Sequence, residues 1–218
     1  MTRYLLLILV LFCQYSSANP TSFESAEIKD WEPQTFSRQT DYELVQLDGK
    51  SVLRASSKQS ASGLVFKKQF DLLKTPYLSW GWRVSKALPE LNERSKNGDD
   101  YAARVYVVIE DGFMGLKTKA LNYVWSGSQQ EGEAWDNAYV GSSVKMVSAR
   151  GLNSSLDKWY YEKRNIYQDL INYFGDKGSH NANMEAYRYI DAIAIMTDTD
   201  NSGLMAEAYY GEIYFSAE

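Results

Sequence analysis

Short strand-like segments separated by turn residues run through most of this sequence, and they restrict the fold to the all-β classes. The clearest segment is Ala102 to Ile109, in which Val105-Tyr106-Val107-Val108-Ile109 is β-branched and almost continuous. Tyr42 to Leu47 and Val52 to Ala55 flank Asp48-Gly49, and this arrangement predicts a hairpin. Strands do not alternate with long helices, so a parallel sheet is not expected. Roughly ten such segments predict an antiparallel β-sandwich of the jelly-roll type.

One short helix is predicted after a polar strand, Trp159 to Asn165, which has the character of an edge strand. Asn165 is a suitable N-cap, and Gln168 follows three residues later as in a capping box. Apolar residues then recur on one helical face, and Gly175 ends the pattern.

The N-terminus has the pattern of a secretory signal peptide over residues 1–18. Arg3 supplies the positive charge, Tyr4 to Phe12 the apolar run, and Ala18 the small residue before the cleavage point. We therefore expect a periplasmic or secreted protein in which residues 19–218 form a single β-sandwich domain. The apolar run is shorter than the ~20 residues of a membrane-spanning helix, so no membrane span is expected.

Cleavage after Ala18 would remove Cys13, the single cysteine, and would exclude disulfides from the mature chain. Lipidation of Cys13 is the less favoured alternative, because bulky Phe12 precedes it. The single histidine, His180, is assigned to a solvated loop, and because the mature chain would contain no cysteine, the usual zinc sites are excluded. The net charge of −5 disfavours nucleic acid as a partner.

The first candidate site is the acidic pair Asp99-Asp100 before the strand that contains Arg104. An arginine on an apolar strand requires an anionic partner, and Asp100 is close in sequence. If the strand begins at Ala102, Arg104 and Tyr106 share one face. The pattern predicts either a buried ion pair that fixes the junction of loop and strand, or a polar site for sugar hydroxyls.

The second candidate site is the acidic turn Asp198-Thr199-Asp200-Asn201-Ser202-Gly203 between the last two strands. Its alternating oxygen donors match the first half of a calcium loop, which makes Asp198 and Asp200 candidate ligands of a structural calcium ion. Tyr209 stands where an EF-hand has its closing glutamate, so a complete EF-hand is excluded. The alternative is a hairpin turn whose side chains bond to their own backbone.

Aromatic residues are abundant, with 17 tyrosines and 6 tryptophans, and they suit both sheet cores and sugar-binding surfaces. Trp125 and Trp135 flank the polar loop of residues 126–132 and are predicted to contact a ligand, with Trp135 the best exposed candidate. The tryptophans that lie within strand patterns are expected in the core: Trp80, Trp82 and Trp159.

Three segments carry a resemblance to a known family: Gly98-Asp99-Asp100-Tyr101-Ala102-Ala103-Arg104-Val105-Tyr106, Tyr123-Val124-Trp125-Ser126, and the tail from Ile193 to Ile213. Together they resemble the bacterial exported-protein family named domain of unknown function 3047. The C-terminal part is more distantly similar to galactose-binding-like jelly rolls. The residues that correspond to the W…D…F segment of those proteins are Trp159, Asp169 and Phe174. These resemblances imply a fold and no activity.

Three functions fit these features. The leading hypothesis is an exported, non-catalytic binding module for a glycan or another cell-envelope ligand, with Asp99, Asp100, Arg104, Trp125 and Trp135 in contact with it. A carbohydrate-active enzyme, hydrolase or lyase, with paired Asp carboxylates as acid and base is the second. The third is an envelope structural or assembly protein that binds another protein through an exposed apolar patch. No established catalytic motif is present, so a binding role is favoured, and a monomer is expected.

Overall fold

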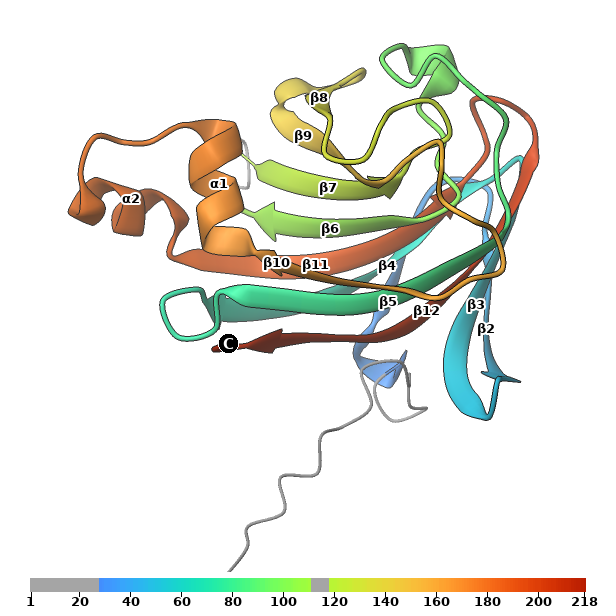
Figure 1. Cartoon of the computed structure of the whole chain (residues 1–218), viewed down its shortest axis with the longest axis horizontal. Coiled ribbons are helices and arrows are strands. Elements are labelled where there is room, and N and C mark those ends of the chain that lie inside the picture. The colour runs from blue at the N-terminus through green and yellow to red at the C-terminus, as the bar shows by residue number, and fades with distance from the viewer. Residues whose placement is uncertain (1–27, 111–117) are drawn as a thin grey trace, which may run out of the picture.

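The computed structural model describes residues 28–110 and 118–218, and this part of the chain forms two packed β-sheets and two α-helices (Figure 1). The larger sheet contains seven strands in the spatial order β1 (Glu32–Ser37), β4 (Ala61–Asp71), β11 (Tyr189–Asp198), β6 (Arg104–Ile109), β7 (Lys119–Trp125), β9 (Gly141–Arg150) and β8 (Ala134–Asn137). The smaller sheet contains five, in the order β10 (Tyr160–Asn165), β5 (Tyr77–Lys86), β12 (Met205–Ser216), β3 (Lys50–Lys58) and β2 (Asp41–Leu47). The predicted signal peptide and Cys13 lie outside the described residues. Among the described helices, none has the length and apolarity that crossing a membrane requires.

Strand pairing confirms the predicted β-sandwich, with one exception to its antiparallel character. In the described sheets β7 and β9 run parallel, and the other neighbours are antiparallel. The predicted hairpin is β2–β3, where Asp48 and Gly49 have φ of 53° and 74°, the left-handed values that a tight hairpin turn needs. Strands β1 and β8 were not predicted from the sequence.

The hydrophobic core lies between the two sheets and contains much of the aromatic content. Val105 and Val107 of β6 point inward with no exposed surface. Trp80 and Trp82 of β5 meet them from the smaller sheet, and their rings pack edge to face at 5.6 Å. The side chains of β6 that alternate with these valines therefore face the outer side of the larger sheet.

The predicted helix is α1 (Ile166–Phe174), at one end of the sandwich (Figure 1). Asn165 caps it as expected, because its Oδ1 accepts a 3.0 Å hydrogen bond from the backbone N–H of Gln168. Gly175 follows the last helical residue with φ of 91°.

A second helix, α2 (His180–Tyr187), was not predicted. Ser179 begins it, since its hydroxyl accepts a hydrogen bond from the backbone N–H of Ala182. The assignment of His180 to a loop is therefore wrong, although the side chain is exposed as expected.

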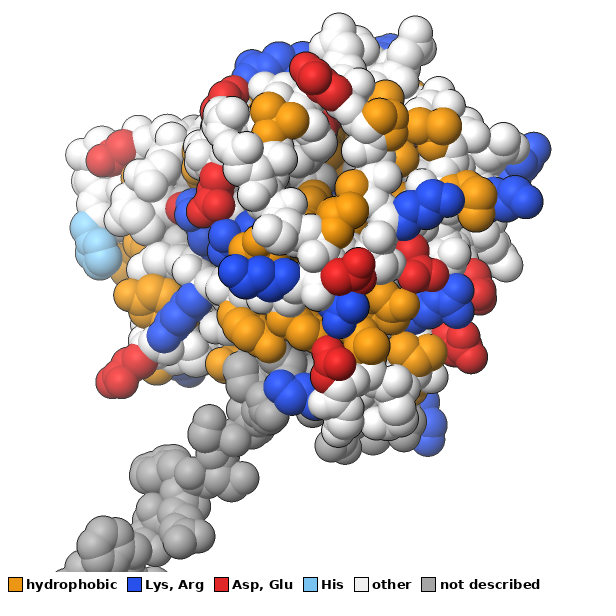
Figure 2. Space-filling model, turned by 45° about the vertical axis from the view of Figure 1, so that its right-hand side comes forward, with side chains coloured by type: hydrophobic (Ala, Val, Ile, Leu, Met, Phe, Trp, Pro, Cys, Tyr) orange, Lys and Arg blue, Asp and Glu red, His pale blue; other side chains and the backbone are white. Residues whose placement is uncertain are grey.

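The surface shown in Figure 2 carries hydrophobic side chains that are interspersed with Lys, Arg, Asp and Glu. This face does not display the broad, uninterrupted apolar patch that would favour docking of a protein partner there.

Candidate functional site

The site is built on the outer face of the larger sheet, where β6 begins and β11 ends. Arg104 is paired in register with Met196 of β11 and Val124 of β7. Because Val105 faces the core, Arg104 and Tyr106 share the outer face, as predicted, and Arg104 Nη1 lies 3.2 Å from Tyr106 Oη. Arg104 is nevertheless buried, and its guanidinium carbon lies 4.3 Å from the ring centroid of Tyr101.

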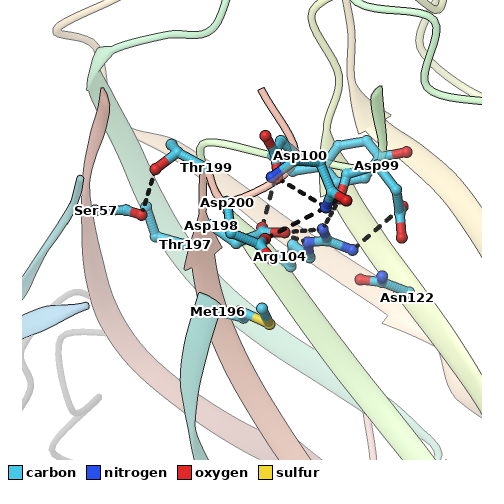
Figure 3. A network of polar contacts seen from close by, with 12 residues as sticks. Ser57, Asp99, Asp100, Arg104, Asn122, Met196, Thr197, Asp198, Thr199 and Asp200 are labelled. Atoms are coloured by element: carbon cyan, nitrogen blue, oxygen red, sulfur yellow. Dashed lines mark hydrogen bonds and ion pairs between the residues drawn. The ribbon is translucent and has the colours of Figure 1, made fainter. Parts of the chain in front are cut away.

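Arg104 pairs with two carboxylates, Asp198 and Asp99 (Figure 3). Arg104 Nε donates to Asp198 Oδ1 at 2.7 Å, and Nη2 donates to the second oxygen of the same carboxylate. Nη2 also donates to the backbone carbonyl of Asp99 at 2.5 Å, and Nη1 lies 3.6 Å from Asp99 Oδ1. The buried ion pair is confirmed, but the expectation that Asp100 is its partner is wrong. Met196 pairs in register with Arg104, so Asp198, two residues further along β11, lies on the same face of the sheet as the guanidinium.

Asp100 holds the acidic turn instead. Its carboxylate accepts hydrogen bonds from the backbone N–H groups of Asn201 at 3.2 Å and Ser202 at 2.6 Å. This contact joins the loop before β6 to the turn between β11 and β12, so the two acidic segments form one site. Carboxylate oxygens of Asp100, Asp198 and Asp200 all lie within 4.8 Å of one another.

Those three oxygens are few for calcium, which takes six to eight oxygen ligands. Two of the three carboxylates already have strong partners in the protein, Asp198 in Arg104 and Asp100 in backbone N–H groups. Asp200 is partly exposed to solvent, whereas Asp100 and Asp198 are buried.

Burial makes this cluster unfavourable for negative charge. It raises the pKa of Asp198 to about 7, and the attraction of Arg104 opposes that rise. Burial also raises the pKa of Asp99 and of Asp200, and for Asp200 the neighbouring Asp100 adds to the effect. Arg104 stays protonated: burial lowers its pKa, but the charge of Asp198 outweighs this and holds the pKa well above its usual value.

A cavity of about 570 Å³ opens over the cluster. Among the candidates, Asp99, Arg104, Asp198 and Asp200 line it, whereas Asp100 is not among the lining residues. Part of its wall is apolar and exposed: Phe36 keeps 71% of its surface accessible, Tyr139 51% and Val140 56%.

Sequence reasoning missed this apolar wall. Phe36 lies on β1, and Tyr139 and Val140 lie in the turn between β8 and β9. Neither β1 nor β8 was predicted, so nothing placed these residues near the acidic segments. Phe36 in the polar stretch Gln34-Thr35-Phe36-Ser37-Arg38 was the available signal, since a lone aromatic in such a stretch is often exposed.

The expectation that Trp125 and Trp135 are exposed ligand platforms is wrong. Trp125 is 4% exposed and packs in the main core, with its ring centroid 5.9 Å from that of Trp82. Trp135 is 7% exposed and belongs to a small second cluster with Tyr101 and Val124. The reason is that Trp135 lies on β8, which pairs with β9 as the edge strand of the larger sheet, and its side chain packs against Tyr101 and Val124. Rings buried in this way are not available to stack on a sugar.

Of the three tryptophans that were expected in the core, two are buried there and one is not. Trp80 and Trp82 are buried in the core, as expected. Trp159 is half-buried, and its ring lies parallel to that of the exposed Tyr161, with centroids 6.5 Å apart, so its placement in the core is wrong.

The chain belongs to the family described as protein of unknown function (DUF3047), which matches residues 29–214. No match was found among curated proteins. One similar solved structure carries the description "cellulose induced protein, Cip1", with 8% identity, a TM-score of 0.50, and coverage of 87% of this chain and 92% of that one. The xyloglucanase domain of NopAA from Sinorhizobium fredii gives 9% identity, a TM-score of 0.46, and coverage of 86% and 93%.

A third similar structure concerns carbohydrate-binding modules of the β-sandwich superfamily, with 7% identity, a TM-score of 0.42 and 89% of this chain covered. The present chain spans 60% of the length of that chain. At these identities the likeness concerns the fold, which is a jelly-roll β-sandwich.

Proposed function

We propose that this member of the family is an exported, non-catalytic binding module whose ligand, a glycan or another cell-envelope component, occupies the cavity on the outer face of the larger sheet. The observation that carries the proposal is the composition of that cavity. The wall includes the carboxylates of Asp99, Asp198 and Asp200 and also the exposed side chains of Phe36 and Tyr139. Small-ligand sites combine apolar walls with a few polar groups in this way, and sugars present both hydroxyls and apolar ring faces.

The test is glycan binding by the mature protein and by a Tyr139→Ala variant. Screening on a panel of envelope and plant glycans identifies a ligand, and titration calorimetry then gives the dissociation constant. We expect Tyr139→Ala to weaken binding at least about tenfold, equivalent to about 1.4 kcal/mol, because it removes one wall of the cavity.

A matched control is Tyr189→Ala. Tyr189 is also exposed and also has a cationic side chain over its ring, Arg188 at 4.8 Å where Tyr139 has Lys96 at 5.2 Å, but it does not line the cavity. Equal affinities of the two variants, or no binding by the wild type to any glycan, would contradict the proposal.

The second candidate function is a carbohydrate-active enzyme, a hydrolase or lyase. The observation in its favour is that one carboxylate oxygen of Asp198 and one of Asp200 lie within 4.8 Å of each other at a cavity, and retaining glycosidases also use two neighbouring carboxyl groups. Against it, Asp198 is held by Arg104 with both oxygens. Release of new reducing ends or unsaturated sugars from a bound glycan, lost in Asp200→Asn, would favour the enzyme over the binding module.

A further inference from the structure

Charge at the acidic end of the cavity is not balanced by the protein. Four carboxylates surround one guanidinium: Asp99, Asp100, Asp198 and Asp200 around Arg104 (Figure 3). Arg104 is the one basic residue among the described residues that line the cavity. The site therefore carries an excess of negative charge in a largely buried setting, where it is costly.

Two of the carboxylates are compensated by the protein itself. Asp198 accepts two hydrogen bonds from Arg104 and a third from the backbone N–H of Tyr101 at 3.2 Å. Asp100 accepts backbone hydrogen bonds from Asn201 and Ser202. The contacts of Asp100 and Asp198 within the protein therefore account for the presence of these two carboxylates.

The carboxylates of Asp99 and Asp200 are compensated less completely than those of Asp100 and Asp198. Asp99 is buried, and its Oδ2 accepts a 3.1 Å hydrogen bond from the side-chain amide of Asn137. Its Oδ1 has no hydrogen-bond partner in the described part of the chain and lies 3.6 Å from Arg104 Nη1, beyond hydrogen-bond range. Asp200 is partly exposed and accepts a 3.3 Å bond from the neutral amide of Asn201. Both carboxylates line the cavity. A buried acceptor without a donor, on a residue that lines a cavity, indicates a donor supplied by a ligand.

The rest of the cavity selects the kind of donor. The exposed aromatic rings of Phe36 and Tyr139 line the same cavity as the carboxylates, and both aromatic faces and carboxylates attract cations. Lys96 already occupies one position over the ring of Tyr139, at 5.2 Å. An anionic ligand would face an excess of carboxylates, and a neutral one would leave that excess in place.

We propose, on the basis of the binding function above, that the ligand is a glycan that carries a protonated amine, as in an amino sugar. Its ammonium group donates to Asp99 Oδ1 and to the carboxylate of Asp200. Its apolar ring face packs on Phe36 and Tyr139.

The experiment compares two oligosaccharides of equal length, one of glucosamine and one of N-acetylglucosamine, at a pH at which the free amine is protonated. Calorimetry of the mature wild-type protein should give at least about tenfold tighter binding of the glucosamine oligomer, or about 1.4 kcal/mol. Asp200→Asn should remove this preference, because it deletes the charge without changing side-chain size. Asp136→Asn is the matched control: it makes the same change in net charge on neighbouring β8, where Asp136 pairs with Lys145 outside the cavity.

The outcomes separate this inference from the function on which it rests. Equal affinity for the two oligomers would overturn the amine and leave the binding module intact. Binding of neither oligomer would contradict the amino sugar, and failure of the whole glycan panel would contradict the function as well. A third arm adds calcium or EDTA: if calcium raises the melting temperature reversibly and competes with the glucosamine oligomer, the acidic end holds a metal ion and not an ammonium group.

Discussion

Replacement of Arg104 by methionine tests whether the buried ion pair fixes the site. The variant keeps most of the side-chain volume but deletes the hydrogen bonds to Asp198 and to the carbonyl of Asp99. Breaking a buried pair by removing one partner costs about 3–5 kcal/mol, because the other charge is left uncompensated. For a chain of this size that corresponds to a fall in melting temperature of roughly 6–20 °C.

The cost should depend on pH in a defined direction. The pKa of Asp198 is about 7 in the folded protein, so its carboxyl is largely ionised at about pH 8 and largely neutral at about pH 5. Arg104→Met strands a charge in the first case and leaves a neutral acid in the second. Urea unfolding followed by tryptophan fluorescence should therefore show a larger loss of unfolding free energy at the higher pH.

Arg94→Met is the matched control. Arg94 also pairs with a carboxylate, that of Glu133 at 2.9 Å, and also lies over an aromatic ring, that of Trp135 at 5.4 Å, but it is exposed. Exposed ion pairs contribute about 0–1 kcal/mol, so its loss should be small and almost independent of pH between 5 and 8. If Arg104→Met costs no more than Arg94→Met at both pH values, the reasoning is refuted.

Three further predictions concern the whole chain. The wild-type melting temperature should fall as pH rises from about 5 to 8 at constant ionic strength. Burial raises the pKa of Asp198, so the stability that the neutral acid contributes is lost as pH passes about 7. A rise in melting temperature over this interval would contradict the raised pKa of Asp198. Gly98→Ala should lower the unfolding free energy by about 1–3 kcal/mol in chemical denaturation, since a Cβ there would lie 2.4 Å from the backbone oxygen of Asn92; an unchanged midpoint would show that the loop adapts. Asn165→Ala should cost about 1 kcal/mol through loss of the α1 cap, measured in the same way, and a neutral result would mean that tertiary packing alone holds the helix end.

The parts of the fold that were predictable depend on local chemistry. The alternation in Ala102 to Ile109 showed which residues face the core, Asp48-Gly49 identified a hairpin, and Asn165 marked the start of α1. Each of these signals is contained in a few consecutive residues. Helix α2 was not predicted because its residues form no strong apolar stripe, and its cap, Ser179, lies in a stretch of turn-forming residues.

The partners within the site depend on strand order and register, which no short stretch of sequence contains. Asp100 seemed the natural partner of Arg104 by proximity in sequence, but the pairing of β6 with β11 placed Asp198 beside the guanidinium. Trp135 seemed exposed because polar residues surround it in sequence, but the pairing of β8 with β9 turns it against the sheet. The sequence drew attention to both acidic segments, but whether they meet, and which residues contact one another, depends on the topology.

That topology also explains why a structural role and a binding role coexist at one place. β6 and β11 are antiparallel neighbours, so the loop that enters β6 meets the turn that leaves β11. One carboxylate from each segment is fully held by the protein: Asp198 accepts from Arg104 with both oxygens, and Asp100 accepts from the backbone of the turn. The second carboxylate of each segment, that of Asp99 and that of Asp200, is less completely held by the protein and also lines the cavity. Substitutions of the first pair should therefore act mainly on the unfolding free energy, and substitution of Asp200 mainly on ligand affinity, which makes the two roles separable by experiment.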